Sequence, residues 1–441
     1  MSARAAAAAL LAGLACAAQA QQPSAPFLES ALRAVLREYV DELDEGVLAG
    51  RCLDGMQAWL SGRGMRLGPT DAPPMQPVNR VGDLLRRVNL QYSGVDFEKL
   101  GDACLKPVAD GLDRHSSYLD REGYREIIGT GPLAGTGLEI AAERGYTKIV
   151  STIDGTPASR ADLQRDDLIL SVDGTSTLNL PLAEVVKLLR GKAGSTAVLE
   201  LSRPGAQGTL RREIVRQFIR IETVRAVPLE GRLLYVRISQ FQSNTYERFL
   251  TVLREQNALV PEGLAGIVLD LRNNSGGLLF SCIALASAFV PESAMVVEMR
   301  GRTPSNQRKL YARPADFNGP PRDASIARLA EPLRSAPLAV VVNRRSAACA
   351  EILAASLQDQ KRATLIGEKT FGHGTVQTIL PLGNSTAVKL TTARYYRSNG
   401  TAMENNPVTP DVVLDLGAGN APFGGADDPA MPVARRALSG R

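Results

Sequence analysis

The sequence predicts a protein of the α/β class, in which a helical region and a small β-rich region precede a core of alternating strands and helices. Residues 266–271 and 337–342 are largely apolar runs, as is typical of strands buried on both faces of a parallel sheet. A turn and a predicted helix follow each run. This alternation of buried strand and helix predicts the α/β core.

Length and composition are those of an ordinary globular protein. The chain has 441 residues, of which 44% are hydrophobic and 22% charged, and this length suggests about two to four domains. The net charge of +5 is small, and the arginines are scattered rather than gathered into a basic block. These features argue against a nucleic-acid partner.

Residues 1–20 have the features of a secretion signal. Arg4 supplies a positive charge, residues 5–18 are small and apolar, and Ala18-Gln19-Ala20 fits the A-x-A cleavage pattern. We therefore expect cleavage after Ala20 and secretion into the periplasm. A weak lipoprotein-like signal makes lipidation at Cys16 the alternative. No later run reaches about 18 apolar residues, so we expect a soluble mature chain.

Removal of the signal leaves four cysteines, at positions 52, 104, 282 and 349. An oxidising compartment permits disulfides, and four cysteines allow three complete pairings. We favour Cys52–Cys104, because both residues lie in the same N-terminal region. Four buried free thiols are the alternative.

Residues 21–128 are predicted to be helical. Apolar residues recur with i, i+3, i+4 spacing between positions 31 and 43, and a second apolar set lies between positions 81 and 92. Cys52 and Cys104 each follow a helical stretch at a similar distance. This similarity suggests a duplicated helical pair.

Residues 129–217 change to short β-rich runs with one amphipathic helix, at 182–189. The loop Gly135-Thr136-Gly137-Leu138 precedes the first run, and its backbone N–H groups can form a concave nest for a carboxylate. Together with a Pro-Ala segment and the helix, this loop resembles a PDZ domain. The resemblance implies that a peptide C-terminus binds at these four residues and adds a strand to the sheet.

Two glycines of the PDZ pattern are replaced here, by Asp162 and Asp166. Aspartate tolerates left-handed backbone better than most residues do. We therefore expect both turns to be kept.

Residues 218–415 carry the alternating pattern of the core. Strands are expected at 233–238, 266–271 and 337–342, and helices at 245–256, from about 279 to 289, and from about 348. Residues 416–441 are rich in Gly, Ala and Pro, which predicts a flexible tail.

Two segments of the core carry the most specific pattern. Residues 346–352 read Ser-Ala-Ala-Cys-Ala-Glu-Ile, and residues 370–377 read Thr-Phe-Gly-His-Gly-Thr-Val-Gln. They resemble the C-terminal processing peptidases of peptidase family S41, whose patterns are Ser-Ala-Ser-Ala-Ser-Glu-Ile and Thr-Phe-Gly-Lys-Gly-x-Val-Gln. The resemblance covers residues 80–415 and implies a crotonase- and ClpP-like core with an inserted PDZ domain.

The resemblance also assigns positions to the site. In that family the middle serine is the nucleophile and the lysine is its base, and the matching positions here are Ala348 and His373. Gln377 matches the residue that positions the lysine. The backbone N–H groups of Gly276 and Cys349 match the oxyanion hole. Because a methyl group cannot attack a carbonyl, we expect an inactive homologue that binds polypeptide C-termini.

An active peptidase with a different nucleophile is the rival hypothesis. Cys349 with His373 would form a familiar Cys–His pair, although one residue along a helix turns a side chain by about 100°, away from the cleft. Ser346 is expected to be structural. His115 is also expected to be a structural hydrogen-bonding residue, distant from His373.

No H-x-x-x-H or paired C-x-x-C spacing is present in the sequence, so we expect neither a metal site nor a cofactor. The resemblance implies two further kinds of partner, an active relative and a helical-repeat adaptor. It is also compatible with a homo-oligomer.

Overall fold

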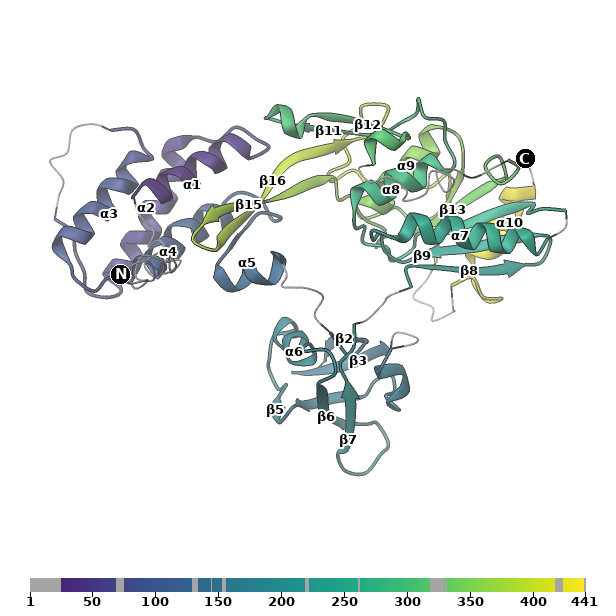
Figure 1. Ribbon diagram of the computed structural model, residues 1–441, viewed down its shortest axis with the longest axis horizontal. Helices are drawn as coiled ribbons and strands as arrows, with labels where there is room; N and C mark the ends of the chain where they lie inside the picture. Colours follow the sequence, from purple (N-terminus) through teal and green to yellow (C-terminus); the bar gives the residue numbers. More distant parts are fainter. Residues whose placement is uncertain are drawn as a thin grey trace, which may run out of the picture. The chain divides into compact units, whose positions relative to one another are not determined.

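The protein is described from a computed structural model (Figure 1). The structure describes residues 25–68, 75–128, 134–143, 145–152, 156–218, 222–260, 262–317, 329, 331–416 and 423–439. The predicted secretion signal and Cys16 lie outside these residues. The chain divides into two compact units, residues 125–222 and the residues on either side of them. None of the described helices is long and apolar enough to cross a membrane.

The N-terminal region is built from two pairs of helices. α1 (Ala25–Glu38) packs against α3 (Asn79–Gln91), and α2 (Glu45–Ser61) packs against α4 (Phe97–Asp110). Asp44 and Asp96 cap α2 and α4 in the same way, since each side chain accepts a backbone N–H three residues later. The predicted disulfide is confirmed, because Cys52 of α2 is bonded to Cys104 of α4. Cys282 and Cys349 are free and buried.

Residues 125–222 form an antiparallel sheet with one helix. The sheet order is β2-β3-β4-β6-β7, with β5 beside β4. The elements are β2 (Leu138–Glu143), β3 (Tyr146–Thr152), β4 (Leu168–Val172), β5 (Thr175–Ser176), α6 (Leu182–Leu189), β6 (Thr196–Ser202) and β7 (Leu210–Val215). As predicted, Asp162 and Asp166 have left-handed backbone, with φ of 50° and 68°.

The core is a six-stranded sheet between two layers of helices. Its order is β17-β14-β13-β10-β9-β8, parallel from β17 to β9, with β8 antiparallel to β9. The strands are β8 (Val224–Leu229), β9 (Leu233–Ile238), β10 (Gly266–Asp270), β13 (Leu338–Val342), β14 (Thr364–Gly367) and β17 (Val412–Val413). Every residue of β10 and β13 is buried, which explains the two apolar runs in the sequence.

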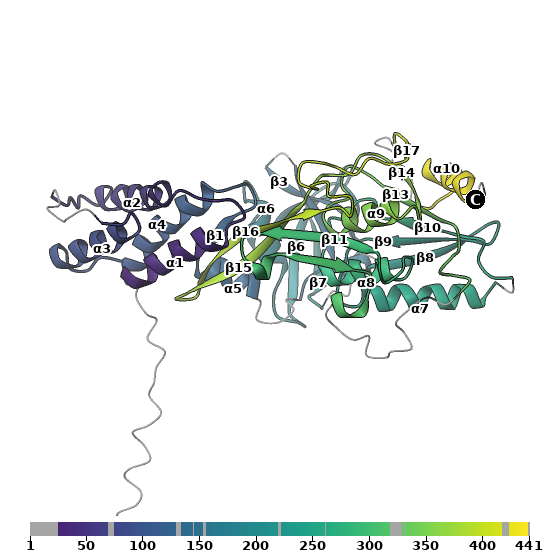
Figure 2. The same cartoon turned by 90° about the horizontal axis from the view of Figure 1, so that it is seen from above.

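The helices of the core cover both faces of this sheet (Figures 1 and 2). On one face, α7 (Thr245–Ala258), α8 (Leu279–Ser287) and α9 (Cys349–Asp359) pack against alternate strand residues such as Val236, Leu269 and Val340. On the other face, α10 (Ala430–Ser439) packs against the residues between them, including Tyr235, Val268 and Val341. The period of two along each strand produces this division.

A second sheet joins the core to the helical region. Its order is β1-β16-β11-β12, and β15 also pairs with β16. The elements are β1 (Ser117–Leu119), β11 (Met295–Gly301), β12 (Arg308–Tyr311), β15 (Thr375–Gly383) and β16 (Thr386–Tyr396), with α5 (Arg121–Ile128) after β1. Val388 and Leu390 of β16 are buried in the helical region's core.

The predicted flexible tail is wrong for residues 423–439, which are folded onto the sheet. Asp428 is buried and accepts hydrogen bonds from both terminal nitrogens of the buried Arg272 guanidinium. Arg272 also binds Asp270, the last residue of β10. The composition of the tail hid an i, i+4 apolar pattern at Ala430, Ala434 and Leu438, which are buried against the sheet.

We predict that Asp428→Asn lowers the free energy of unfolding by about 3 kcal/mol. That is the low end of the range for removing one partner from a buried ion pair, because Asp270 still faces Arg272. Urea denaturation at pH 7 measures the change. Asp427→Asn, at the exposed neighbouring position, is the matched control and should leave stability unchanged.

The stability difference should also depend on pH. Burial raises the pKa of Asp428, but hydrogen bonds from Arg272, Gly424 and Ala430 outweigh burial and hold that pKa below the ordinary value of 3.8. A carboxyl with a lowered folded-state pKa contributes stability above its unfolded pKa and loses it as the pH falls through the folded pKa. The gap between the wild type and Asp428→Asn should therefore close below pH 3.8. A gap that persists at lower pH would contradict this account.

Candidate functional site

Three loops meet at the edge of the six-stranded sheet where β10, β13 and β14 end. The loops span residues 271–278, 343–348 and 368–374. Adjacent parallel strands bring their C-terminal loops together, which is where open α/β sheets bind ligands. The Ala347 N–H donates to the Asn274 carbonyl at 2.9 Å. The first two loops are therefore joined backbone to backbone.

Ala348 lies at the tip of the second loop, immediately before α9, and its backbone is strained. Its φ of 49° and ψ of −114° are rare for a residue with a side chain. Gly276 lies against it, since a Cβ on Gly276 would be 2.9 Å from the Ala348 Cβ and 3.1 Å from the Cys349 nitrogen. The loop thus holds position 348 in a special conformation, yet presents only a methyl group there.

The buried carboxylate of Glu351 ties this tip to the third loop. One oxygen, Oε2, accepts the Ala348 N–H at 3.0 Å and the His373 N–H at 2.9 Å. The other, Oε1, accepts the Thr370 hydroxyl at 2.5 Å and the Gly372 N–H at 2.7 Å. Burial raises the pKa of Glu351, and these four donors oppose that rise. The predicted nucleophile and base positions therefore share one anchoring oxygen.

His373 lies in the third loop, with its ring against His115. The ring centroids are 4.6 Å apart and the rings meet edge to face. The prediction that His115 is distant from His373 is wrong, because β16 pairs both with β1, which follows His115, and with β15, which follows His373. Burial, and then the neighbouring His115, lower the pKa of His373 below 6.5, while the charge of Glu404 and a hydrogen bond to Gln377 oppose this in part.

Gln377 lies two residues into β15 and contacts His373. Its side-chain nitrogen donates to the Thr375 hydroxyl at 2.7 Å, and its side chain also hydrogen-bonds to His373. The carboxamide is therefore fixed at one end by a threonine and supports the imidazole at the other.

Glu404 and Arg114 complete the surroundings of the two histidines. Glu404 Oε2 accepts the Gly374 N–H at 2.8 Å, and Glu404 Oε1 lies 3.5 Å from His115 Nε2. The Arg114 guanidinium donates to His115 Nε2 at 3.0 Å and to Glu404 Oε1 at 3.2 Å. The site thus contains a carboxylate and two imidazoles where a single base position was predicted. These three side chains are close enough to form a group that could hold a metal ion, although the sequence predicted no metal site.

Cys349, the rival nucleophile, faces the core. Its thiol is buried and donates to the Gly277 carbonyl at 3.2 Å. It also hydrogen-bonds to Cys282, and burial followed by this contact raises the pKa of the Cys282 thiol. This placement agrees with the rotation predicted for the first residue of a helix and counts against a Cys349–His373 pair.

Gly276, one of the two predicted oxyanion donors, and Ser346 both have hydrogen-bond partners within the protein. The Gly276 N–H donates to the Asn274 side-chain oxygen at 2.8 Å. A substrate oxygen would therefore compete with Asn274 for this donor. The buried Ser346 hydroxyl donates to the Leu271 carbonyl at 2.8 Å and accepts the Asn343 N–H at 3.0 Å, as expected of a structural residue.

The predicted peptide-binding loop lies in the 125–222 unit, at the start of an edge strand. Gly135 exchanges backbone hydrogen bonds with Gln217, and Gly137 has a φ of 86°. A Cβ on Gly137 would overlap the Thr156 side chain. Leu138 begins β2, which pairs on one side only, with β3. Leu138 packs against the hydrophobic core to which Val185 and Leu189 of α6 also belong.

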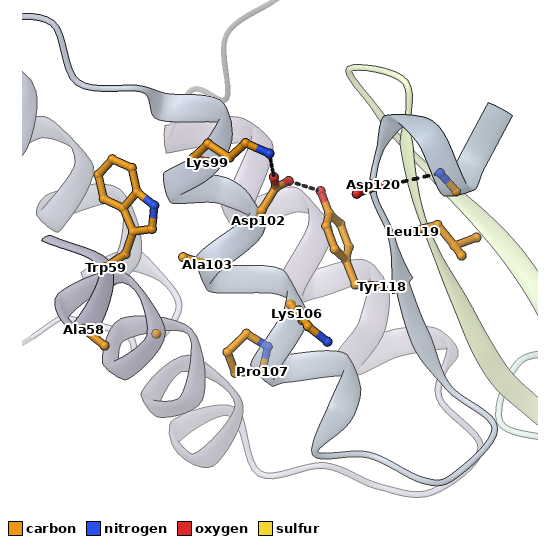
Figure 3. Close-up of a pocket in the computed structure, with 12 residues that line it drawn as sticks. Ala58, Trp59, Lys99, Asp102, Ala103, Lys106, Pro107, Tyr118, Leu119 and Asp120 are labelled. Carbon is orange, nitrogen blue, oxygen red and sulfur yellow. Dashed lines mark hydrogen bonds and ion pairs between the residues drawn. The ribbon is translucent and has the colours of Figure 1, made fainter. Parts of the chain in front are cut away.

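A cavity of about 660 Å³ opens in the helical region, between α2, α4 and β1 (Figure 3). Its lining includes Trp59, Pro107 and Tyr118. The Tyr118 hydroxyl donates to Asp102 at 2.8 Å. None of the predicted site residues lines this cavity, so it is separate from the loops described above.

Sequence reasoning missed Glu351, Glu404 and the role of His115. A local signal existed for Glu351, which stands three residues after Ala348, as the acidic residue of a capping box does. Glu404 gave no such signal, because it lies in the loop after β16 and reaches His115 only through the pairing of β1 with β16.

Two protein-family models match the chain. The model of peptidase family S41 matches residues 232–414, and a PDZ-domain model matches residues 148–203. The first therefore covers the loops that carry Ala348 and His373, and the second covers most of the separate β-rich unit.

Individual relatives agree with these matches. The carboxy-terminal-processing protease of Bartonella bacilliformis is 36% identical over 340 residues, which cover 76% of this chain and 74% of that protein. The carboxyl-terminal-processing protease of Synechocystis is 33% identical over 302 residues, 67% of this chain and 66% of that protein. The structure of the photosystem II D1 C-terminal processing protease is similar, with a TM-score of 0.53 and 29% identity over 89% of this chain and 93% of that chain.

We predict that Glu351→Gln destabilises the protein by about 2–3 kcal/mol. An amide offers one acceptor oxygen instead of two, so buried N–H donors lose their partner. Chemical denaturation measures the loss, and Glu255→Gln on the exposed side of α7 is the control. If both variants were equally stable, Glu351 would not be the anchor of this site.

Proposed function

The chain belongs to peptidase family S41, and from this premise we propose that it binds the C-termini of polypeptides without cleaving them. It is a homologue of the C-terminal processing proteases and carries a PDZ domain. Ala348 carries the proposal. It has the strained backbone and the Gly276 contact of a nucleophile position, but a methyl group has no lone pair with which to attack.

The surroundings of Ala348 support a loss of peptidase activity that leaves the fold of the site intact. Glu351 binds the backbone of positions 348 and 373 rather than their side chains. Replacement of a serine and a lysine at these positions therefore removes no hydrogen bond from this anchor. His373 alone would accept a proton at neutral pH, but it has no hydroxyl or thiol at position 348 from which to take it.

We predict that Ala348→Ser combined with His373→Lys restores cleavage. The pair reinstates a nucleophile and a base on backbone positions that Glu351 already fixes. Hydrolysis of an unfolded protein or of a peptide with an apolar C-terminus is the measurement. His373→Lys alone is the matched control and should stay several orders of magnitude slower, because it lacks the nucleophile.

The rival function, a peptidase that uses Cys349, predicts a different set of results. The wild type would then cleave the peptide, and Cys349→Ala or a thiol alkylator would abolish cleavage. The buried thiol, bonded to Gly277 and Cys282, disfavours this outcome. A correctly folded double variant that stays inactive would count against an intact catalytic frame.

The PDZ unit supports the binding half of the proposal. Its glycine-containing loop at residues 135–138 precedes an edge strand, and such loops can hold a terminal carboxylate while the peptide extends along the strand. The left-handed Gly137 packs against Thr156 and leaves no room for a side chain there. Substrate specificity would then come from the residues between β2 and α6.

We predict that a peptide with a free C-terminal carboxylate binds more tightly than the same peptide with an amidated end, as measured by isothermal titration calorimetry. Leu138→Glu should weaken binding roughly tenfold or more, since a nearby negative charge repels the ligand carboxylate. Leu178→Glu, at an exposed leucine in the turn after β5, is the matched control. Equal affinity for the two peptides would contradict recognition of the carboxylate.

Secretion into the periplasm is part of the proposal. It is supported by the signal-like residues 1–20 and by the disulfide between Cys52 and Cys104, since disulfides persist in oxidising compartments.

A further inference from the structure

The two histidines of the chain and Glu404 form a group that the Ser–Lys mechanism does not require. One ring nitrogen of each histidine and one carboxylate oxygen of Glu404 all lie within 4.8 Å of one another. The His115 Nε2 and the Glu404 Oε1 are already 3.5 Å apart. Tetrahedral ligands at about 2.1 Å from Zn²⁺ are about 3.4 Å apart. A small inward movement of the third group would complete such a set.

The second sheet fixes where these three side chains lie. His115 precedes β1 by two residues, His373 precedes β15 by two residues, and both strands pair with β16. Glu404 lies in the loop that follows β16. Strand β16 thus brings together three segments that are far apart in the sequence. Its backbone hydrogen bonds to β1 and β15 fix the positions from which the three side chains extend.

Glu404 and His373 are each oriented by a neighbour other than Arg114. Glu404 Oε2 is bound by the Gly374 N–H, while Oε1 faces His115. The His373 ring is supported by Gln377. The His115 Nε2 accepts a hydrogen bond from Arg114, which a metal ion would have to displace. Supporting partners of this kind orient the ligands in metal sites.

Arg114 shows that the group attracts a cation. Its guanidinium donates to His115 Nε2 and to Glu404 Oε1, the same two atoms that a metal would take. The Arg114 side chain is 58% exposed, so it can move into solvent. Arg114 would then compete with a metal ion for His115 Nε2 and Glu404 Oε1 but would not prevent the ion from binding.

We propose that His115, His373 and Glu404 bind one divalent transition-metal ion, of which Zn²⁺ is the best match. Two imidazoles and one carboxylate suit Zn²⁺ and its neighbours, whereas Mg²⁺ and Ca²⁺ prefer oxygen ligands. Three protein ligands leave a fourth position for water or for a peptide carboxylate. The metal would lie beside the backbone that Glu351 shares between positions 348 and 373.

The test uses the mature, tag-free chain after treatment with a chelator. Titration with Zn²⁺ by calorimetry should show one site, and Mg²⁺ and Ca²⁺ should show none. Glu404→Gln keeps an acceptor for the Gly374 N–H but loses the charge. It should weaken Zn²⁺ binding by more than the roughly 10–100-fold that loss of a supporting partner costs. Arg114→Ala should strengthen binding a few-fold, because a surface ion pair no longer competes. Glu255→Gln is the matched control.

Nuclear magnetic resonance of the histidine side chains provides a second test of Zn²⁺ binding, and it needs no variant. The whole sequence has only two histidines, so the imidazole region contains two residues, and Zn²⁺ should shift the signals of both. Absence of Zn²⁺ binding, unchanged affinity in Glu404→Gln, or a shift of neither histidine would overturn the proposal. None of these measurements uses a peptide or a cleavage reaction, so their failure is separate from failure of the proposed peptide binding.

Discussion

The carboxylate of Glu351 is the constraint on which the site depends. It is buried among four donors that come from the start of α9 and from the loop before β15. A buried carboxylate with full hydrogen bonding has one favourable position, because each lost bond leaves an unsatisfied group. The backbone at position 373 is therefore fixed relative to the backbone at position 348, whatever side chains those positions carry.

This dependence on backbone explains how a peptidase fold can keep its shape while its reactive groups change. The glycines of the first loop allow close approach, and the second loop keeps a φ of 49° at Ala348. A left-handed alanine costs of order 1 kcal/mol or more, and the surrounding hydrogen bonds offset it. This conformation does not depend on a catalytic side chain, since no hydrogen bond of the anchor involves a hydroxyl at position 348 or an amine at position 373.

The sequence predicted the parts of this molecule that have local causes. The apolar runs of β10 and β13 follow from burial on both faces of a parallel sheet. Asp162 and Asp166 keep left-handed turns because aspartate tolerates that backbone. The Cys52–Cys104 bond follows from the proximity of α2 and α4. The direction of the Cys349 thiol follows from helix geometry alone.

What the sequence did not predict depends on contacts between distant segments. His115 and Glu404 meet because β1 pairs with β16, and no residue near either position indicates that pairing. The burial of Asp428 depends on its pairing with Arg272, which is 156 positions away in the sequence. In both cases a charged or polar residue in a loop is given its role by a partner that local patterns cannot identify.

The pairing of Arg272 with Asp428 also has a consequence for the cooperativity of folding. The two residues are 156 positions apart in the sequence, so their contact closes a long loop. A sheet that formed before residues 423–439 docked on it would leave the Arg272 guanidinium short of one carboxylate in a dry interior, at considerable electrostatic cost. The ion pair therefore couples the docking of α10 to the completion of the central sheet, so that the two belong to one folding unit.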